Sequence, residues 1–76
     1  MRLSQLHYFE AVGRLESVTK AAEELHISQP SLSMSIKGLE DELGISLFHR
    51  QNKRLYLTEE GRYFLQQLSD ILGQLE

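Results

Sequence analysis

The sequence predicts a mainly α fold in which three helices and a small β-hairpin precede a long final helix. Four stretches repeat apolar residues at intervals of three and four, the spacing of one helix face. Residues 54–58 instead alternate polar and apolar side chains, as a half-buried strand does. The 76 residues include no cysteine, so we expect a single domain whose core is held by packing alone.

The first helix is predicted over residues 4–15, with Ser4 as its cap, from the spacing of Leu3, Leu6, Phe9, Val12 and Leu15. A second helix of about eight residues is predicted to begin after Ser17, a favourable N-cap. A helix this short is unstable alone, so it must pack on its neighbours. Ala21 and Ala22 are small enough to let two helix backbones approach closely.

A third helix is predicted to follow the short connection at His26 and Ile27. Ser28 is its expected cap, and Pro30 falls in the first turn, where a missing N–H costs no hydrogen bond. Its core stripe has the spacing four, three and four: Leu32, Ile36, Leu39 and Leu43. Gly44 is predicted to end the helix in the left-handed conformation.

Residues 46–58 are predicted to form the hairpin, with a polar turn at Gln51, Asn52 and Lys53. Thr58 is the expected cap of the last helix, whose first turn contains two acids that the helix dipole favours. The apolar pattern of this helix continues to the penultimate residue: Phe64, Leu65, Leu68, Ile71, Leu72 and Leu75. Because no stop signal follows, we expect a helix that is truncated here and continues in a longer protein.

A short helix, a tight turn and a longer helix are the arrangement of a helix-turn-helix, and a hairpin after them would be a wing. At about 100° per residue, the face of the third helix opposite Leu32 carries Pro30, Ser33, Met34, Lys37 and Asp41. Gln29 and Ser31 lie on its flanks. An amide of this kind recognises base edges, whereas hydroxyls and a lysine bond phosphates. The N–H groups at the helix N-terminus also favour a phosphate.

The net charge of −3 argues against a protein that coats nucleic acid by bulk positive charge, but the charges are segregated. Residues 28–39 contain Lys37 and no acid, and residues 50–58 contain Arg50, Lys53 and Arg54 and no acid. Acids gather at residues 40–42 and in the last helix. The basic residues therefore lie on the predicted third helix and wing.

Other classes of function find little support. The three histidines, His7, His26 and His49, do not have metal-ligand spacing, and we find no convincing catalytic triad, phosphate loop or carboxylate pair. We therefore expect no enzyme activity, no metal and no cofactor. Apolar runs are too short to span a membrane and no secretory signal is present, which favours the cytoplasm.

Two segments resemble the N-terminal domain of LysR-type transcriptional regulators. They are Ala21-Ala22-Glu23-Glu24-Leu25-His26-Ile27-Ser28-Gln29-Pro30-Ser31-Leu32-Ser33 and, after it, Ile36-Lys37-Gly38-Leu39-Glu40 with Glu42-Leu43-Gly44-Ile45-Ser46-Leu47-Phe48. Leu57-Thr58-Glu59-Glu60-Gly61 is similar to the junction between wing and last helix in this family. The resemblance covers essentially the whole chain.

The resemblance implies a winged helix-turn-helix over residues 1–58, with the helix-turn-helix at about 18–37 and the wing at about 46–58, and a linker helix over residues 59–76. It implies that the third helix enters the major groove of operator DNA and that the wing lies at or near the minor groove. The predicted DNA-contacting residues are Thr19, Lys20, Ser28, Gln29, Pro30, Ser31, Ser33, Met34, Lys37, Arg50, Lys53 and Arg54.

One residue departs from the family pattern, because Met34 stands where these regulators often have arginine. We expect Met34 to make an apolar contact with the operator instead. The resemblance also implies a homodimer through Phe64, Leu65, Leu68, Ile71, Leu72 and Leu75, leaving open a higher oligomer of a full-length protein. A small-molecule effector is expected only for a C-terminal domain that this sequence does not include.

The leading hypothesis is thus a sequence-specific, double-stranded DNA-binding domain of a bacterial regulator, working in the cytoplasm at the nucleoid. Two alternatives stay open at this point. Winged helices also serve as protein-interaction modules, which the acidic balance would suit, and the chain could be an autonomous helical dimer. The salt dependence of binding to duplex DNA separates the first hypothesis from the other two.

Overall fold

The computed structural model describes the backbone of residues 1–75 and the side chains of residues 1–73. The elements follow in the order α1 (Leu3–Leu15), α2 (Val18–Leu25), α3 (Gln29–Leu43), β1 (Phe48–Gln51), β2 (Arg54–Leu57) and α4 (Glu59–Leu75). The mainly α fold with one hairpin is as the sequence predicts. No helix in the described part of the chain is long and apolar enough to cross a membrane.

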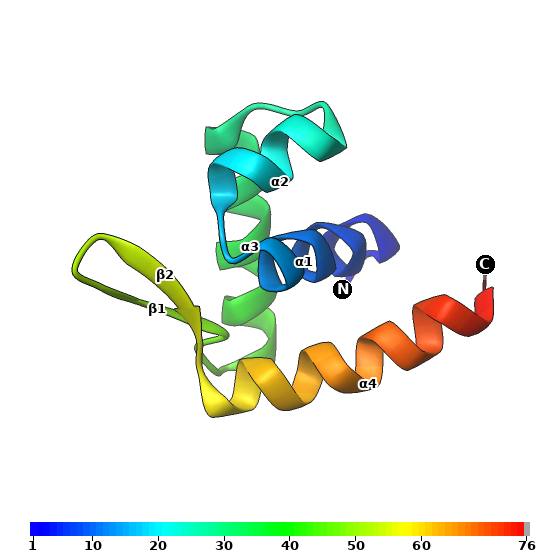
Figure 1. Ribbon diagram of the computed structural model, residues 1–76. Helices are drawn as coiled ribbons and strands as arrows, with labels where there is room; N and C mark the ends of the chain where they lie inside the picture. The colour runs from blue at the N-terminus through cyan, green and yellow to red at the C-terminus, as the bar shows by residue number, and fades with distance from the viewer. Residues whose placement is uncertain (76) are drawn as a thin grey trace.

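Helix α1 lies at the centre of the fold and packs against α2, α3 and α4 (Figure 1). Its Phe9 is fully buried. The centroid of the Phe9 ring lies 5.4 Å from that of the Phe48 ring and 5.3 Å from that of the Phe64 ring. The same core contains Leu32 and Leu39 from the predicted stripe of α3. One apolar cluster therefore joins all four helices to the base of the hairpin, which projects away from them in Figure 1.

Most of the predicted helix ends are confirmed. Ser17 accepts the Lys20 N–H at 3.1 Å, Ser28 accepts the Ser31 N–H at 3.2 Å, and Gly44 ends α3 with a φ of 71°. The predicted Ser4 cap is wrong, because α1 begins one residue earlier, at Leu3. Arg2 holds the N-cap position, where its backbone N–H donates to Gln5 Oε1 at 2.8 Å.

The hairpin is antiparallel, and its turn is shorter than predicted. Gln51 is opposite Arg54 in the ladder, so it belongs to β1 and not to the turn. The turn consists of Asn52 and Lys53, with φ values of 53° and 64°. Two successive residues with positive φ are typical of the type I′ turn, whose twist matches that of the two strands.

The apolar stripe of α4 packs within its own chain. Leu68 and Leu72 are buried in the core, and Phe64 and Leu65 pack against it. These four side chains were predicted to pair with a second copy, but α1 and its neighbours already cover much of their surface. Ile71 is 55% exposed, and the side chain of Leu75 lies outside the described residues. The pairing of two copies itself stays a prediction.

Candidate nucleic-acid interface

Helices α2 and α3 are joined by a short turn whose conformation is set by its own residues and the end of α2. His26 ends α2 in the left-handed conformation, with a φ of 58°, and the Ile27 N–H donates to the Ala22 carbonyl at 3.1 Å. Ala21 and Ala22 are buried, as their small size predicted. The turn and the close packing of small side chains bring the start of α2 beside the first half of α3 (Figure 1).

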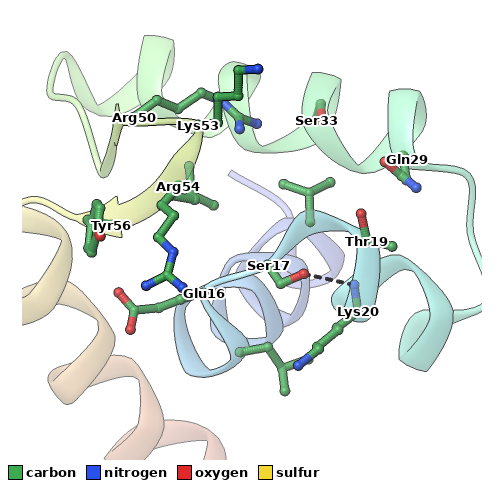
Figure 2. A pocket seen from close by; sticks show the side chains of 13 residues that line it. Glu16, Ser17, Thr19, Lys20, Gln29, Ser33, Arg50, Lys53, Arg54 and Tyr56 are labelled. Atoms are coloured by element: carbon green, nitrogen blue, oxygen red, sulfur yellow. Dashed lines mark hydrogen bonds between the residues drawn. The ribbon is translucent and has the colours of Figure 1, made fainter.

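A groove of about 530 Å³ lies between the start of α2, the first half of α3 and the hairpin (Figure 2). Seven predicted DNA-contacting residues line it: Thr19, Lys20, Gln29, Ser33, Arg50, Lys53 and Arg54. They come from α2, from α3 and from the hairpin. The fold therefore gathers amide, hydroxyl and cationic groups along one open surface, which we call the basic groove.

The five other predicted residues lie outside this groove. Lys37 borders a smaller hollow between α3 and the hairpin, together with Ser33 and Arg50. Ser28, Pro30 and Ser31 lie at the start of α3, and Met34 lies further along that helix. All twelve predicted side chains are exposed, so none is buried in the core.

The start of α3 has hydroxyl groups already engaged with one another. Ser28 Oγ accepts the Ser31 N–H and donates to Ser31 Oγ at 2.9 Å. Ser28 therefore acts as the cap of α3, and the proton of the Ser31 hydroxyl is left to donate outward. A hydroxyl that donates at a helix N-terminus suits an anionic oxygen such as that of a phosphate.

The hairpin presents positive charge on both of its faces. Arg50 is opposite Leu55 and Arg54 is opposite Gln51, and successive residues of a strand point to opposite faces. Leu55 is half-buried, whereas Arg54 and Tyr56 are exposed. The His49 and Tyr56 rings stack across the strands with centroids 5.6 Å apart. The ribbon thus places one arginine on each face and Lys53 at its tip.

A carboxylate fixes the hairpin to α3. Glu40, in the last turns of that helix, accepts the backbone N–H of Leu47 at 2.6 Å and that of Phe48 at 3.3 Å. Two N–H groups at the start of the hairpin are thereby satisfied by one side chain of α3. Glu40 therefore holds the start of the hairpin against α3. It is one of three consecutive acids to which the sequence assigned no role.

The cations of the basic groove are left without ion-pair partners. Within the described residues, the three ion pairs are Met1 with Glu42 and Arg14 with Glu10 and Glu24, all away from the groove. Arg14 bonds to Glu24, which holds the pKa of that exposed carboxyl below its usual range. The five cations of the groove and the adjoining hollow are therefore free to meet an external anion.

Six residues that line the groove were not among the predicted contacts, and the two exposed ones are Glu16 and Tyr56. Glu16, the C-cap of α1 with a φ of 49°, lines the groove, and its carboxylate points toward Arg54 in Figure 2. Tyr56 lines the groove beside the hairpin. Periodicity gave no signal for either, because Glu16 lies between two helices and Tyr56 was predicted only as part of the alternating strand over residues 54–58. The described residues contain no group of histidines and acids able to hold a metal.

A short helix, a tight turn, a second helix with an exposed polar face and a basic hairpin together define a winged helix-turn-helix domain. Comparison with known proteins narrows the class. The sequence model described as "Bacterial regulatory helix-turn-helix protein, lysR family" matches residues 3–62. The chain therefore belongs to the LysR family of bacterial regulatory proteins.

Curated relatives and solved structures agree with this assignment. The chain is 60% identical over 60 residues to the RuBisCO operon transcriptional regulator of Allochromatium vinosum, a match that covers 79% of this chain and 20% of that protein. It is 47% identical over 73 residues to the glycine cleavage system transcriptional activator of Escherichia coli K12, which covers 96% of this chain and 24% of that protein. The chain thus spans about a fifth to a quarter of these relatives.

Two similar structures were solved as DNA complexes. The BenM DNA-binding domain on catB site 1 DNA matches with a TM-score of 0.93 and 44% identity, covering 99% of this chain and 83% of that one. The CbnR DNA-binding domain in complex with DNA matches with a TM-score of 0.90 and 36% identity, covering 99% and 86%. The fold of this chain is therefore that of LysR-family domains solved on DNA.

Proposed function

We propose that this chain binds double-stranded DNA sequence-specifically, as the DNA-binding part of a bacterial transcriptional regulator. The observation that carries the proposal is the basic groove, where seven exposed polar and cationic side chains from α2, α3 and the hairpin converge. The family and the two similar DNA complexes support the same function. Its place of action is then the cytoplasm, at the nucleoid.

In the proposed complex, the N-terminal half of α3 lies in the major groove, where Gln29 and Pro30 approach base edges. Ser31, Ser33 and Lys37 contact the phosphates beside them. Thr19 and Lys20, at the start of α2, contact the same backbone from the other side of the basic groove. Phosphate contacts of this kind fix the register of the protein on the duplex, and base contacts then give specificity.

The wing supplies the remaining cations. Arg50, Lys53 and Arg54 are exposed on the hairpin, which projects away from the helices in Figure 1. A projecting basic ribbon of this kind suits the phosphates that border the neighbouring minor groove. We therefore place the wing at or near the minor groove.

We also propose that two copies pair through α4. Tyr63, Gln67 and Ile71 follow one another at intervals of four, so they lie along one side of that helix. Tyr63 is 67% exposed and Ile71 is 55% exposed, whereas the neighbouring leucines pack on α1. This exposed side is the surface of α4 that a second copy would cover. In a dimer, two copies of α3 would address half-sites one or more turns of DNA apart.

Duplex binding measured over a range of salt concentrations tests the proposal. Affinity should fall steeply with salt, and replacing Lys37 or Arg50 by alanine should lower the salt slope by about one. Arg2→Ala is the matched control, because Arg2 is exposed and does not line the groove. It should leave the slope almost unchanged. No duplex binding at low salt, by a chain shown to be folded and dimeric, would favour a protein-interaction module instead.

A further inference from the structure

Met34 is exposed on the face of α3 that we propose enters the major groove. Its exposed fraction is 74%, the largest among the exposed large hydrophobic side chains of the described residues. It lies outside the core cluster and outside the set of side chains that pack against it. Folding therefore gains almost nothing from an apolar residue here, and a soluble helix surface would carry a polar one equally well.

The neighbours of Met34 place it within a binding face. Ser33 precedes it and lines the basic groove, and Lys37 follows it by three residues and borders the adjoining hollow. Pro30 lies four residues earlier, on the same side of the helix and also exposed. Pro30 and Met34 thus form a short apolar strip between polar groups that suit phosphates. When those groups contact the backbone on either side, the strip faces the base edges.

The chemistry of the major groove leaves one partner for such a strip. Each base pair shows hydrogen-bond donors and acceptors there, and the C5-methyl group of thymine is the apolar feature among them. A thioether has no donor and accepts only weakly, so Met34 gains little from guanine, adenine or cytosine edges. Its unbranched side chain adapts to the shape it meets.

We propose that Met34 is a specificity-determining residue that recognises the C5-methyl group of a thymine in the major groove. The inference rests on the proposed function and extends it, because it names the base and the atom that one side chain distinguishes. Met34 selects thymine by removing that methyl from water, without a hydrogen bond.

The test begins with the duplex that the 76-residue chain selects from a random pool. Each thymine of that duplex is then replaced, one at a time, by deoxyuridine, which lacks only the C5-methyl group. We expect one thymine in each half-site whose replacement weakens binding about fourfold, the ratio for one buried group of methylene size. Replacing any of the other thymines should weaken binding less.

Two variants connect the effect to the side chain. Met34→Gln keeps the length of the side chain and makes its end polar, so its affinity should no longer depend on the methyl at that position. Met34→Leu keeps an apolar side chain and should retain the dependence. Met34 is exposed, so thermal melting should show both variants folded like the parent chain.

The outcomes are distinct. A deoxyuridine profile that is the same for Met34→Gln and the parent chain would overturn the inference, as would a selected duplex in which no thymine responds. Either result would leave the proposed DNA-binding function standing. Failure to select any duplex would overturn the proposed function, and the inference with it.

Discussion

Gly61 lies against the backbone carbonyl of Leu47 so closely that a Cβ on Gly61 would fall 2.1 Å from that oxygen. The same carbonyl accepts the Thr58 N–H at 3.0 Å. Thr58 Oγ1 donates to the Ser46 carbonyl at 2.7 Å and accepts the Gly61 N–H at 2.9 Å. The first turn of α4 is thus fastened to the chain that leads into the hairpin, and the absence of a side chain at Gly61 permits the contact.

We expect Gly61→Ala to destabilise the fold by about 3 kcal/mol, because the contact is with backbone and a rotamer change cannot relieve it. Urea denaturation measures the change. Gly73→Ala is the control, since Gly73 is also in α4 and a Cβ there would meet nothing within 4 Å. That variant should be more stable than the parent by up to about 1 kcal/mol, because alanine has a higher helix propensity than glycine. Equal stability of the two variants would contradict the role given to Gly61.

Lys53→Gly should raise stability while lowering DNA affinity. Lys53 has a φ of 64°, which costs a residue with a Cβ about 1–2 kcal/mol and glycine much less. Part of this gain is lost to the greater freedom of glycine in the unfolded chain, so we expect about 0.5–1 kcal/mol. The lost charge should lower the salt slope of duplex binding by about one. Lys53→Asn, which also removes the charge but tolerates the left-handed region better than most residues, is the comparison.

Stability should respond to acid through Glu24. Bonding to Arg14 lowers the pKa of the Glu24 carboxyl in the folded chain from its ordinary 4.5. A carboxyl whose pKa is lower in the folded state contributes stability above its unfolded pKa, and this contribution is lost as pH falls through the folded pKa. Thermal melting from pH 7 to pH 3 should show Glu24→Gln less stable than the parent at pH 7, with the difference closing below about pH 4.5.

The size of this effect should be small, because both side chains are exposed and solvent screens the pair. Glu23→Gln, which removes the same charge from the neighbouring position of α2, is the control. A difference between Glu24→Gln and its parent that stays constant down to pH 3 would mean that the ion pair does not produce it.

What the sequence could predict was local. A 3.6-residue period was enough to bury Leu32 and Leu39 and to expose Met34, and the residues Ser17, Ser28 and Gly44 were enough to mark helix ends. These features depend on side chains within a turn or two of one another. The predicted DNA-contacting residues of α3 are exposed for the same reason.

The sequence pattern could not predict the contacts between helices and strands. The apolar stripe of α4 has the same spacing whether it packs on α1 or on a second copy, so periodicity could not show that Leu68 and Leu72 lie in the core of one chain. The closeness of Gly61 to Leu47 and the bonds from Glu40 to the hairpin also depend on how distant segments meet. The basic groove itself is a product of that packing.

Glu16 shows how a residue outside every pattern can alter function. Its carboxylate lines the groove that we propose receives DNA, alongside Lys20 and Arg54. A negative charge there repels phosphates and opposes the cations around it. We expect Glu16→Gln to raise affinity for duplexes of any sequence about two- to fourfold at about 50 mM salt, as one added favourable charge does at a partly screened distance.

Titration of a selected duplex and of an unrelated duplex, each at several salt concentrations, checks this. The gain from Glu16→Gln should be similar for both duplexes and should shrink as salt rises, because screening shortens the reach of the charge. Glu23→Gln makes the same change in net charge on an exposed α2 residue that does not line the groove, so its gain should be smaller. Equal gains from the two variants would show that net charge alone is responsible, and that the place of Glu16 in the groove is immaterial to binding.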